Sequence, residues 1–365
     1  MSTKLFLRGH LLVPTPRPNT QEEKWQTKLR RFEKHSPVVV ITGSSAGLGR
    51  AIAHAFAKRG AKLGLLARNP EALNAACSEC EALGGTALAV PTDVSDAEAV
   101  EKAATRVEAE FGPIDIWVND AMVSVFSPVK EMEASDYRRV TEVLYLGFVH
   151  GTLAALRRML PRNRGTIIQI GSALSYRSIP LQSAYCACKH AINGFTDSLR
   201  CELHHDQSSV QLTTVQMPAM NTIQFDWVKN RMPNMTQPVP PIFEPEVTAQ
   251  VVVAAAYAAR PRREYWVGTP TVAAILGQKV IPGLLDRYLG KTGYKSQQIP
   301  SEKQDPNAPN NLYNYVPGKW SARGKFDSRS ARSSAEVFIS LHFHWLALGL
   351  AGLVAGGFAL KKARD

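Results

Sequence analysis

The sequence contains few cysteines, and their small number limits the kinds of protein that it can encode. Only Cys77, Cys80, Cys186, Cys188 and Cys201 occur in 365 residues, an odd number that fits a reducing compartment better than a disulfide framework. Cys77 and Cys80 have the spacing of a metal pair, but no second pair and no histidine accompanies them in that segment. The nine histidines show no HExxH or other ligand spacing, so we expect no metal site.

A continuous apolar run is missing from the N-terminus. The stretch MSTKLFLRGHLLVPTPRPNT interrupts its apolar residues with Arg8, Gly9 and His10 and then continues into three prolines. It is too broken for a secretory signal. We therefore expect residues 1–36 to be a basic, poorly ordered arm.

The middle of the chain carries little net charge. Residues 1–36 and 319–365 each carry eight Lys/Arg against three Asp/Glu, and the two ends together account for +10 of the formal +12. A nucleic-acid-binding core would carry the charge itself. The distribution argues against nucleic acid as a partner and favours basic flanks beside a membrane or in solvent.

The residues that are present predict a globular α/β protein. The chain is 45% hydrophobic and 20% charged, which is typical of a folded domain. We expect strands at 38–42, 62–67, 86–90, 114–119, 166–171, 210–217 and 264–268, separated by helices at 47–59, 70–83, 96–111, 135–160, 183–205 and 246–259. Strands that alternate with helices build parallel sheets through right-handed crossovers. The predicted fold is a doubly wound parallel sheet, Rossmann-like, with about seven strands and helices on both faces.

The C-terminal part changes character twice. Residues 296–336 are polar, rich in Pro and Asn and without apolar periodicity, which indicates a linker. Residues 337–360 contain no Asp, Glu, Lys or Arg, and roughly 20 such residues cross a bilayer core. We predict a transmembrane helix there, followed by a basic tail at 361–365; a buried terminal helix of the globular domain is the alternative.

These boundaries leave a central domain at 37–270 and an extension at 271–295. The extension has helical apolar spacing. A lid on the substrate side, an amphipathic segment resting on a membrane and a helix packed on the core all fit this pattern.

A glycine-rich turn, TGSSAGLG, follows the first expected strand directly. Glycines there permit a sharp turn and bring backbone N–H groups and a helix N-terminus close to a diphosphate. The position between a strand and a helix predicts a dinucleotide site formed by Gly43, Ser45, Gly47, Leu48 and Gly49.

The residue after the second expected strand indicates which dinucleotide binds. A carboxylate there would hydrogen-bond the ribose hydroxyls and repel a 2′-phosphate, whereas an arginine can pair with that phosphate. The sequence has Ala67 and then Arg68. NADP(H) is therefore favoured over NAD(H), although a single arginine can also be a solvated surface residue.

The turn TGSSAGLG and the segment GSALSYRSIPLQSAYCACKHA together resemble the short-chain dehydrogenase/reductase family, over about residues 37–270. That family pairs a TGxxxGxG turn with a Ser and then Tyr-xxx-Lys, which correspond here to Ser172, Tyr185 and Lys189. Tyr185 and Lys189 share one face of a helix. We expect the lysine to lower the pKa of the tyrosine towards working pH.

The resemblance implies a role for each of these residues. Ser172 would hydrogen-bond the substrate oxygen, Tyr185 would transfer the proton, and Lys189 would hold the nicotinamide ribose. It also implies coenzyme contacts for Asp93 and Val94 at adenine, for Asn119 and Ala121 in the family's NNAG motif, for Pro218, and for Thr222 at the carboxamide.

The chain departs from the family pattern at several positions. Asp120 and Met122 replace Asn and Gly of the NNAG motif, and Ala219 replaces a Gly. Leu144 replaces the Asn of a water-linked proton relay to the lysine, so the usual relay is in doubt.

These observations predict an NADP(H)-preferring oxidoreductase that acts on a carbonyl or secondary alcohol. The anchor and the apolar extension suggest a lipophilic small-molecule substrate. Because NADPH is intracellular, the catalytic domain should face the cytoplasm from a single-pass membrane anchor. The resemblance implies a homo-oligomer formed through the long helices, and the departures keep open a catalytically weak dinucleotide-binding sensor or scaffold at a membrane.

Overall fold

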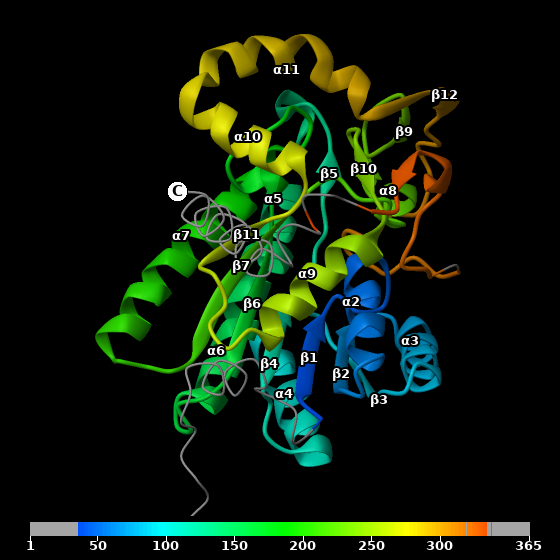
Figure 1. Cartoon of the computed structure of the whole chain (residues 1–365). Coiled ribbons are helices and arrows are strands. Elements are labelled where there is room, and N and C mark those ends of the chain that lie inside the picture. The colour runs from blue at the N-terminus through cyan, green and yellow to red at the C-terminus, as the bar shows by residue number, and fades with distance from the viewer. Residues whose placement is uncertain (1–35, 319, 334–336, 338–365) are drawn as a thin grey trace, which may run out of the picture.

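The computed structural model describes residues 36–318, 320–333 and 337, and its centre is a seven-stranded sheet (Figure 1). The strand order is β11-β7-β6-β4-β1-β2-β3, and every neighbouring pair is parallel. The strands are β1 (Val38–Thr42), β2 (Lys62–Ala67), β3 (Thr86–Pro91), β4 (Ile116–Asn119), β6 (Thr166–Ser172), β7 (Gln211–Met217) and β11 (Glu264–Trp266). The predicted doubly wound sheet is confirmed.

The chain reverses its direction of winding at β1. It first adds β2 and β3 on one side of β1, and then returns to add β4, β6, β7 and β11 on the other side. The connections that leave β1 and β4 therefore diverge at the carboxyl ends of these strands. Ligands of open α/β sheets bind in the crevice at such a switch point.

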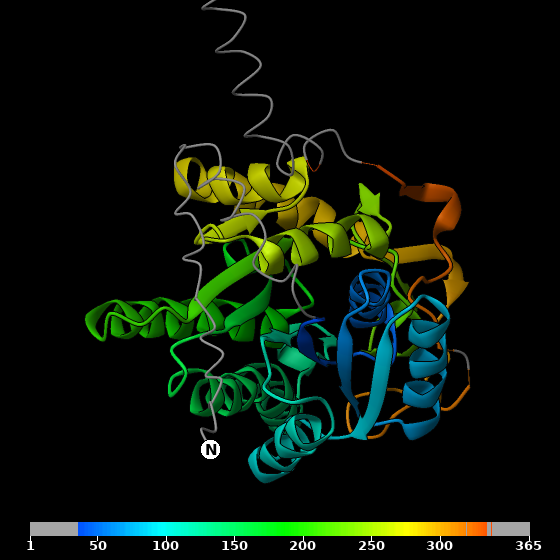
Figure 2. The ribbon, with the colours of Figure 1, turned by 60° about the horizontal axis from the view of Figure 1, so that its bottom comes forward.

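Helices cover both faces of the sheet (Figure 2). One face carries α2 (Gly47–Ala57), α3 (Pro70–Ala82) and α9 (Pro245–Tyr257), and the other carries α4 (Ala97–Phe111), α6 (Gly147–Met159) and α7 (Ser183–His205). Each face has its own apolar core, which explains why the strands are almost continuously apolar. The side chains of Asn69 and Asp96 cap α3 and α4 by accepting two backbone N–H bonds each.

The predicted helix at 135–160 has three parts. It consists of α5 (Ala134–Val140), a π-helical segment η2 (Thr141–Leu146) and α6. The π-helical segment packs against α7, and such segments are frequent at functional sites. Leu144 lies in it and is completely buried.

The extension at 271–295 forms a helical hairpin of α10 (Thr269–Val280) and α11 (Pro282–Ser296), which lies at the top of Figure 1. The side chain of Arg177 ties it to the loop after β6, since it bonds Gln278 at 2.7 Å and Asp286 at 2.6 Å. A Cβ at Gly293 would lie 2.5 Å from the Pro180 ring. The hairpin therefore packs closely on the segment that precedes α7.

In residues 36–318, 320–333 and 337, no helix combines the length and the apolar content that crossing a bilayer requires. The predicted transmembrane helix at 337–360 lies outside the described residues except for Val337, and the tail at 361–365 lies outside them entirely. The predicted arm at 1–36 lies outside them except for Ser36.

The segment predicted as a linker, 296–336, is folded onto the body wherever the structure describes it. Here β12 (Gln298–Lys303) pairs with β9 (Asn234–Thr236), and β13 (Ser330–Ala331) pairs with β10 (Ile242–Phe243). Residues 305–318 and 320–323, which we call the strap, run between these two pairs (Figure 1, orange). The strap is held largely through its backbone carbonyl groups, so its attachment needs no apolar periodicity.

Candidate active site

The turn after β1 has a shape that requires glycine. Gly43 and Gly47 adopt φ of +75° and +58°, a region that residues with a Cβ rarely occupy. A Cβ at Gly43 would lie 2.7 Å from the Cα of Ala121, and a Cβ at Gly49 would lie 2.4 Å from the carbonyl oxygen of Gly43. The turn is thus packed directly against the chain that leaves β4.

A cavity of about 640 Å³ lies at the carboxyl ends of the strands. Most of the residues predicted from the sequence line it: Gly43, Ser45, Gly47, Leu48, Arg68, Asp93, Val94, Ala121, Ser172, Tyr185, Lys189, Pro218 and Thr222. Gly49 and Asn119 do not line it. The structure therefore brings segments that are far apart in sequence around one cavity.

Ser172, Tyr185 and Lys189 meet at one end of this cavity. Ser172 ends β6, and Tyr185 and Lys189 lie in the first two turns of α7. A hydrogen bond joins the side chains of Ser172 and Tyr185. The ammonium of Lys189 donates to the carbonyl oxygen of Ile170 at 2.6 Å and lies 5.7 Å from the centroid of the Tyr185 ring.

The expected lowering of the Tyr185 pKa does not occur in this structure. Burial raises the pKa of the Tyr185 phenol, and the hydrogen bond from Ser172 opposes that rise only in part. Burial also lowers the pKa of Lys189, which is 2% exposed. The lysine is desolvated and committed to Ile170, so its charge does not overcome the desolvation of the phenol.

Asp120, which replaces an Asn of the family motif, is a buried carboxyl group beside this site. It accepts a hydrogen bond from the backbone N–H of Gly49, and its own N–H donates to Thr42 Oγ1 at 3.0 Å. Burial raises the pKa of Asp120, while the positive charge of Lys189 acts in the opposite direction. In turn Asp120 raises the pKa of Lys189 against the effect of burial. The two groups thus form an interacting acid and base that line the same cavity.

Leu144 occupies the position of the family's relay Asn and brings no polar group there. Its side chain is 0% exposed and belongs to the apolar core of the face that carries α4, α6 and α7. The negative charge of Asp120 opposes the lowering of the Lys189 pKa by burial.

Asn119 lies in a buried polar network that joins β4 to α6. Its Oδ1 accepts from Trp117 Nε1 at 2.8 Å, and its Nδ2 donates to Thr152 Oγ1 at 3.1 Å and to Gln169 Oε1 at 2.9 Å. The coenzyme contact that the resemblance implies for Asn119 therefore does not come from its side chain, because all of these bonds point into the core.

Arg68 and Asp93 line the cavity but already have protein partners. The guanidinium of Arg68 donates to the carbonyl oxygens of Asn311 and Tyr313 at 2.6 and 2.8 Å. Burial lowers the pKa of Arg68. Asp93 forms an ion pair of 2.6 Å with Arg139. No motif in the sequence indicates a role for Arg139 at this site.

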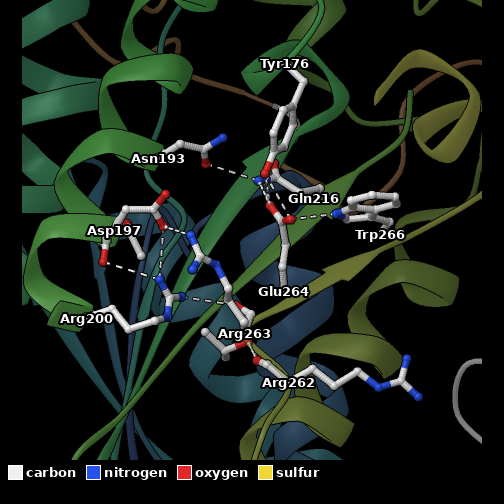
Figure 3. Close-up of polar contacts among 11 residues, drawn as sticks. Tyr176, Asn193, Asp197, Arg200, Gln216, Arg262, Arg263, Glu264 and Trp266 are labelled. Carbon is white, nitrogen blue, oxygen red and sulfur yellow. Dashed lines mark hydrogen bonds and ion pairs between the residues drawn. The ribbon is translucent and has the colours of Figure 1, made fainter. Parts of the chain in front are cut away.

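A polar network behind Ser172 was not predicted (Figure 3). The backbone N–H of Ser172 donates to Gln216 Oε1 at 2.7 Å. Gln216 Nε2 in turn donates to Glu264, which also accepts from Tyr176 Oη at 2.8 Å and from Trp266 Nε1 at 2.6 Å. No sequence pattern connects these residues, which come from the end of β6, the C-cap of η3 (Ala173–Ser175), β7 and β11.

The coenzyme side of the cavity fits a dinucleotide. The first N–H groups of a helix have no partner within it. In α2, the Gly47 N–H donates to Ser321 and the Gly49 N–H donates to Asp120. Among the described residues, the Leu48 N–H has no such partner. The side-chain Nδ2 of Asn69 is likewise buried without a partner in the part of the chain that the structure describes. One unpaired N–H group at a helix N-terminus and one unpaired amide donor suit a diphosphate and a phosphorylated ribose.

Comparisons with known proteins agree with this geometry. The model of the family described as short chain dehydrogenase matches residues 37–231. The chain is 30% identical over 364 residues to the Uncharacterized oxidoreductase YxnA of Bacillus subtilis strain 168, a match that covers 97% of this chain and 99% of that one. It is 36% identical over 184 residues to the human Dehydrogenase/reductase SDR family member 7, covering 49% of this chain and 54% of that one.

A solved structure is also similar. It is the crystal structure of a metagenomic short-chain oxidoreductase in complex with NADP, which is 30% identical with a TM-score of 0.54. The similarity covers 63% of this chain and 96% of that one.

Proposed function

The chain belongs to the short-chain dehydrogenase family, and we propose that it is an NADP(H)-dependent oxidoreductase that acts on a lipophilic carbonyl compound or secondary alcohol. The observation that carries this proposal is the meeting of Ser172, Tyr185 and Lys189 at a cavity that the glycine-rich turn also lines. One side of the cavity offers a helix N-terminus to a coenzyme, and the other side offers proton donors to a substrate.

Each of the three side chains has a separate task. The nicotinamide ring, when bound, would supply or accept the hydride. Tyr185 donates its proton to the carbonyl oxygen during reduction and recovers it from the alcohol during oxidation. Burial raises the pKa of this phenol, so it is present in the protonated form that can donate to a carbonyl oxygen. Ser172 donates a hydrogen bond to the same oxygen as negative charge develops on it, and Lys189 holds the ribose.

A preference for NADP(H) rests on the residues that follow β2. Arg68 and Asn69 stand there, and neither is acidic. A guanidinium has five N–H donors, and two of its nitrogens bond the strap once each. The remaining N–H groups suffice for a 2′-phosphate. The similar metagenomic oxidoreductase was solved with NADP.

The substrate side of the cavity is mainly apolar, which supports a lipophilic substrate. Its lining there includes Phe225, Val228, Val239, Leu285 and Leu289. Such a surface gains free energy by removing apolar ligand area from water, at about 25 cal/mol per Å². The two leucines belong to α11, so the hairpin forms part of the substrate's surroundings.

The outer face of the hairpin supports association with a membrane. Six large apolar side chains of the hairpin are exposed: Leu276, Val280, Ile281, Leu284, Tyr288 and Tyr294. Lys279, Arg287, Lys291 and Lys295 lie on the same helices, and their acidic residue, Asp286, is paired with Arg177. Apolar residues bordered by lysine and arginine favour the surface of an anionic lipid layer. In this proposal the hairpin lies on the membrane, 337–360 anchors the chain, and the catalytic domain faces the cytoplasm.

Two exposed leucines support a homo-oligomer. Leu153 and Leu160, in α6 and at its C-cap, are 42% and 41% exposed. Covering them by a second copy of the chain would remove apolar surface from water. In this proposal the second copy packs on α6, as the family resemblance implies.

The proposal is tested with the purified full-length protein in lipid nanodiscs. Fractions of a lipid extract are screened for NADPH oxidation, with Tyr185→Phe as the control. Wild-type turnover that disappears in the variant, while calorimetric NADPH binding persists, supports the mechanism. Turnover that survives in Tyr185→Phe would refute it.

A second candidate function is a dinucleotide-binding sensor with little turnover. The apolar Leu144 favours it, because its buried side chain brings no polar group to the position of the family's relay Asn. NADPH binding without oxidation across a broad panel of ketones and aldehydes would select this candidate.

A further inference from the structure

The strap lies beyond the part of the chain that matches the family model, which ends at residue 231. It is nevertheless attached to the predicted coenzyme residues. The carbonyl oxygens of Asn311 and Tyr313 accept from Arg68, and that of Leu312 accepts from Arg139 Nε at 3.0 Å. Leu312 is 0% exposed. This end of the strap is therefore fixed beside the end of β2.

The other end of the strap is attached to the glycine-rich turn. The carbonyl oxygen of Ser321 accepts from the N–H of Gly47 at 2.9 Å. Shortly after it, a Cβ at Gly324 would lie 2.7 Å from the carbonyl oxygen of Thr222. The strap thus spans from the residues predicted to hold the adenosine to the turn predicted to hold the diphosphate.

The cavity continues beneath the strap. Asn311, Tyr315, Val316 and Trp320 line the same cavity as the glycine-rich turn and Ser172. The strap leaves the Leu48 N–H and part of the Arg68 guanidinium without strap partners. The strap thus covers the site from outside and leaves these donors available to a coenzyme.

Two polar atoms of the strap are enclosed without a partner. They are Asn311 Oδ1 and Trp320 Nε1, neither of which has a hydrogen bond to the described residues. Enclosing a polar atom without a hydrogen-bond partner is unfavourable, so a bound partner would stabilise it. Asn311 stands next to Arg68, and Trp320 precedes Ser321 at the glycine-rich turn. An acceptor and a donor are thus supplied where a coenzyme has an adenosine and a diphosphate.

We infer that the strap is the outer wall of the coenzyme site, and that Asn311 and Trp320 bind the coenzyme beneath it. Trp320 Nε1 donates to a diphosphate oxygen, and the Asn311 amide pairs with the adenosine half. The inference rests on the proposed use of a dinucleotide. A competing arrangement, in which the strap blocks the site, predicts the opposite effect on affinity.

The test is calorimetric binding of NADPH, and of 2′,5′-ADP as the adenosine half alone, to the full-length protein. Trp320→Phe retains the ring and removes the donor, and should weaken NADPH binding about tenfold, the value of one hydrogen bond to a charged group. Asn311→Ala should weaken binding of 2′,5′-ADP about threefold to tenfold. Tyr313→Phe is the matched control, because Tyr313 lies in the strap, is 49% exposed and bonds Ser135 instead.

Hydrogen–deuterium exchange provides a second measurement that needs no variant. NADPH should protect the strap amides in the wild-type protein, and absence of protection contradicts the inference. Unchanged affinity in both variants, or higher affinity in either, also overturns it. If wild-type protein binds no dinucleotide at all, the proposed function fails first, so the two failures are distinguishable.

Discussion

Gln216 Oε1 accepts a hydrogen bond of 2.7 Å from the backbone N–H of Ser172. This oxygen also lies close to β6, because a Cβ at Gly171 would be only 2.1 Å from Gln216 Oε1. Gln216 can hold this orientation because its Nε2 donates to Glu264 and to Asn193 Oδ1. The position of the proposed catalytic serine thus depends on residues that do not line the cavity.

Glu264→Gln is predicted to disturb Ser172 through Gln216. The substitution sets an amide NH₂ against the donors from Tyr176, Trp266 and Gln216, which should cost about 1–3 kcal/mol of unfolding free energy. We expect kcat to fall while the Kd of NADPH is unchanged. Asp197→Asn is the control, because Asp197 pairs with Arg200 and Arg263 on the outside of the same region (Figure 3). Equal losses in the two variants would argue against a positioning role.

Asp120→Asn is predicted to move the pH profile of activity. The carboxylate of Asp120 raises the pKa of Lys189 against the effect of burial. Without it the pKa of Lys189 falls further, so the ammonium loses its proton at a lower pH and the alkaline limb of kcat/KM should shift to lower pH. Profiles of wild-type and variant protein, each saturated with NADPH, check this. Superimposable profiles would show that Asp120 does not act through Lys189.

The same carboxyl group has a predicted effect on stability. Because burial raises the pKa of Asp120 above its ordinary value, its ionisation opposes folding. This cost is absent below the ordinary pKa of an aspartate and is complete above the raised one. Asp120→Asn removes the cost, so the stability of the variant relative to wild type should improve as pH rises between those limits. Urea unfolding across that range provides the measurement, and a constant difference contradicts it.

Arg68→Ala is predicted to change coenzyme selectivity. The substitution removes the bonds between Arg68 and the strap, which should weaken the binding of both coenzymes. Only NADPH also loses a partner for its 2′-phosphate. The ratio of the Kd for NADH to that for NADPH should therefore fall about tenfold or more, since a charge-assisted bond contributes roughly 1.5–3 kcal/mol. Arg68→Lys retains the charge, so its Kd ratio should lie between those of the wild type and Arg68→Ala. Equal weakening of NADH and NADPH would assign Arg68 to the strap alone.

Leu284→Glu is predicted to impair use of a membrane-dissolved substrate. Leu284 is 59% exposed on the hairpin, and a charge there opposes insertion into a lipid layer. The KM for a ketone partitioned into anionic vesicles should rise, while the KM for a water-soluble ketone stays the same. Val129→Glu is the control, because Val129 is 65% exposed and lies outside the hairpin. A similar rise in both variants would show that the hairpin is not the lipid-facing surface.

The sheet and most helices could be predicted from the sequence because their signals are local. The apolar run at 38–42 and the glycines that follow it specify both β1 and the start of α2. Tyr185 and Lys189 could be paired because one helix fixes their spacing. The breakdown of the helix at 135–160 into α5, η2 and α6 could not be predicted, since a π-helical segment leaves the apolar pattern intact.

The strap could not be predicted because its bonds use backbone carbonyl groups, which every residue possesses. The contact of Glu264 with Gln216 was equally hidden, because the two are 48 positions apart and neither belongs to a motif. The direction in which the Tyr185 pKa is shifted depends on burial, which the spacing of Tyr185 and Lys189 does not encode. Local chemistry was thus readable, whereas its surroundings required the three-dimensional structure.

The bond between Gly47 and Ser321 also bears on how the protein is made. A ribosome synthesises the glycine-rich turn well before Ser321, whose carbonyl oxygen accepts from the Gly47 N–H. Because domains fold as the chain emerges, a nascent chain that has completed its sheet still lacks the wall over the turn. The wall over the turn therefore forms only after residue 321 has been synthesised, and a chain truncated before that residue cannot close the site.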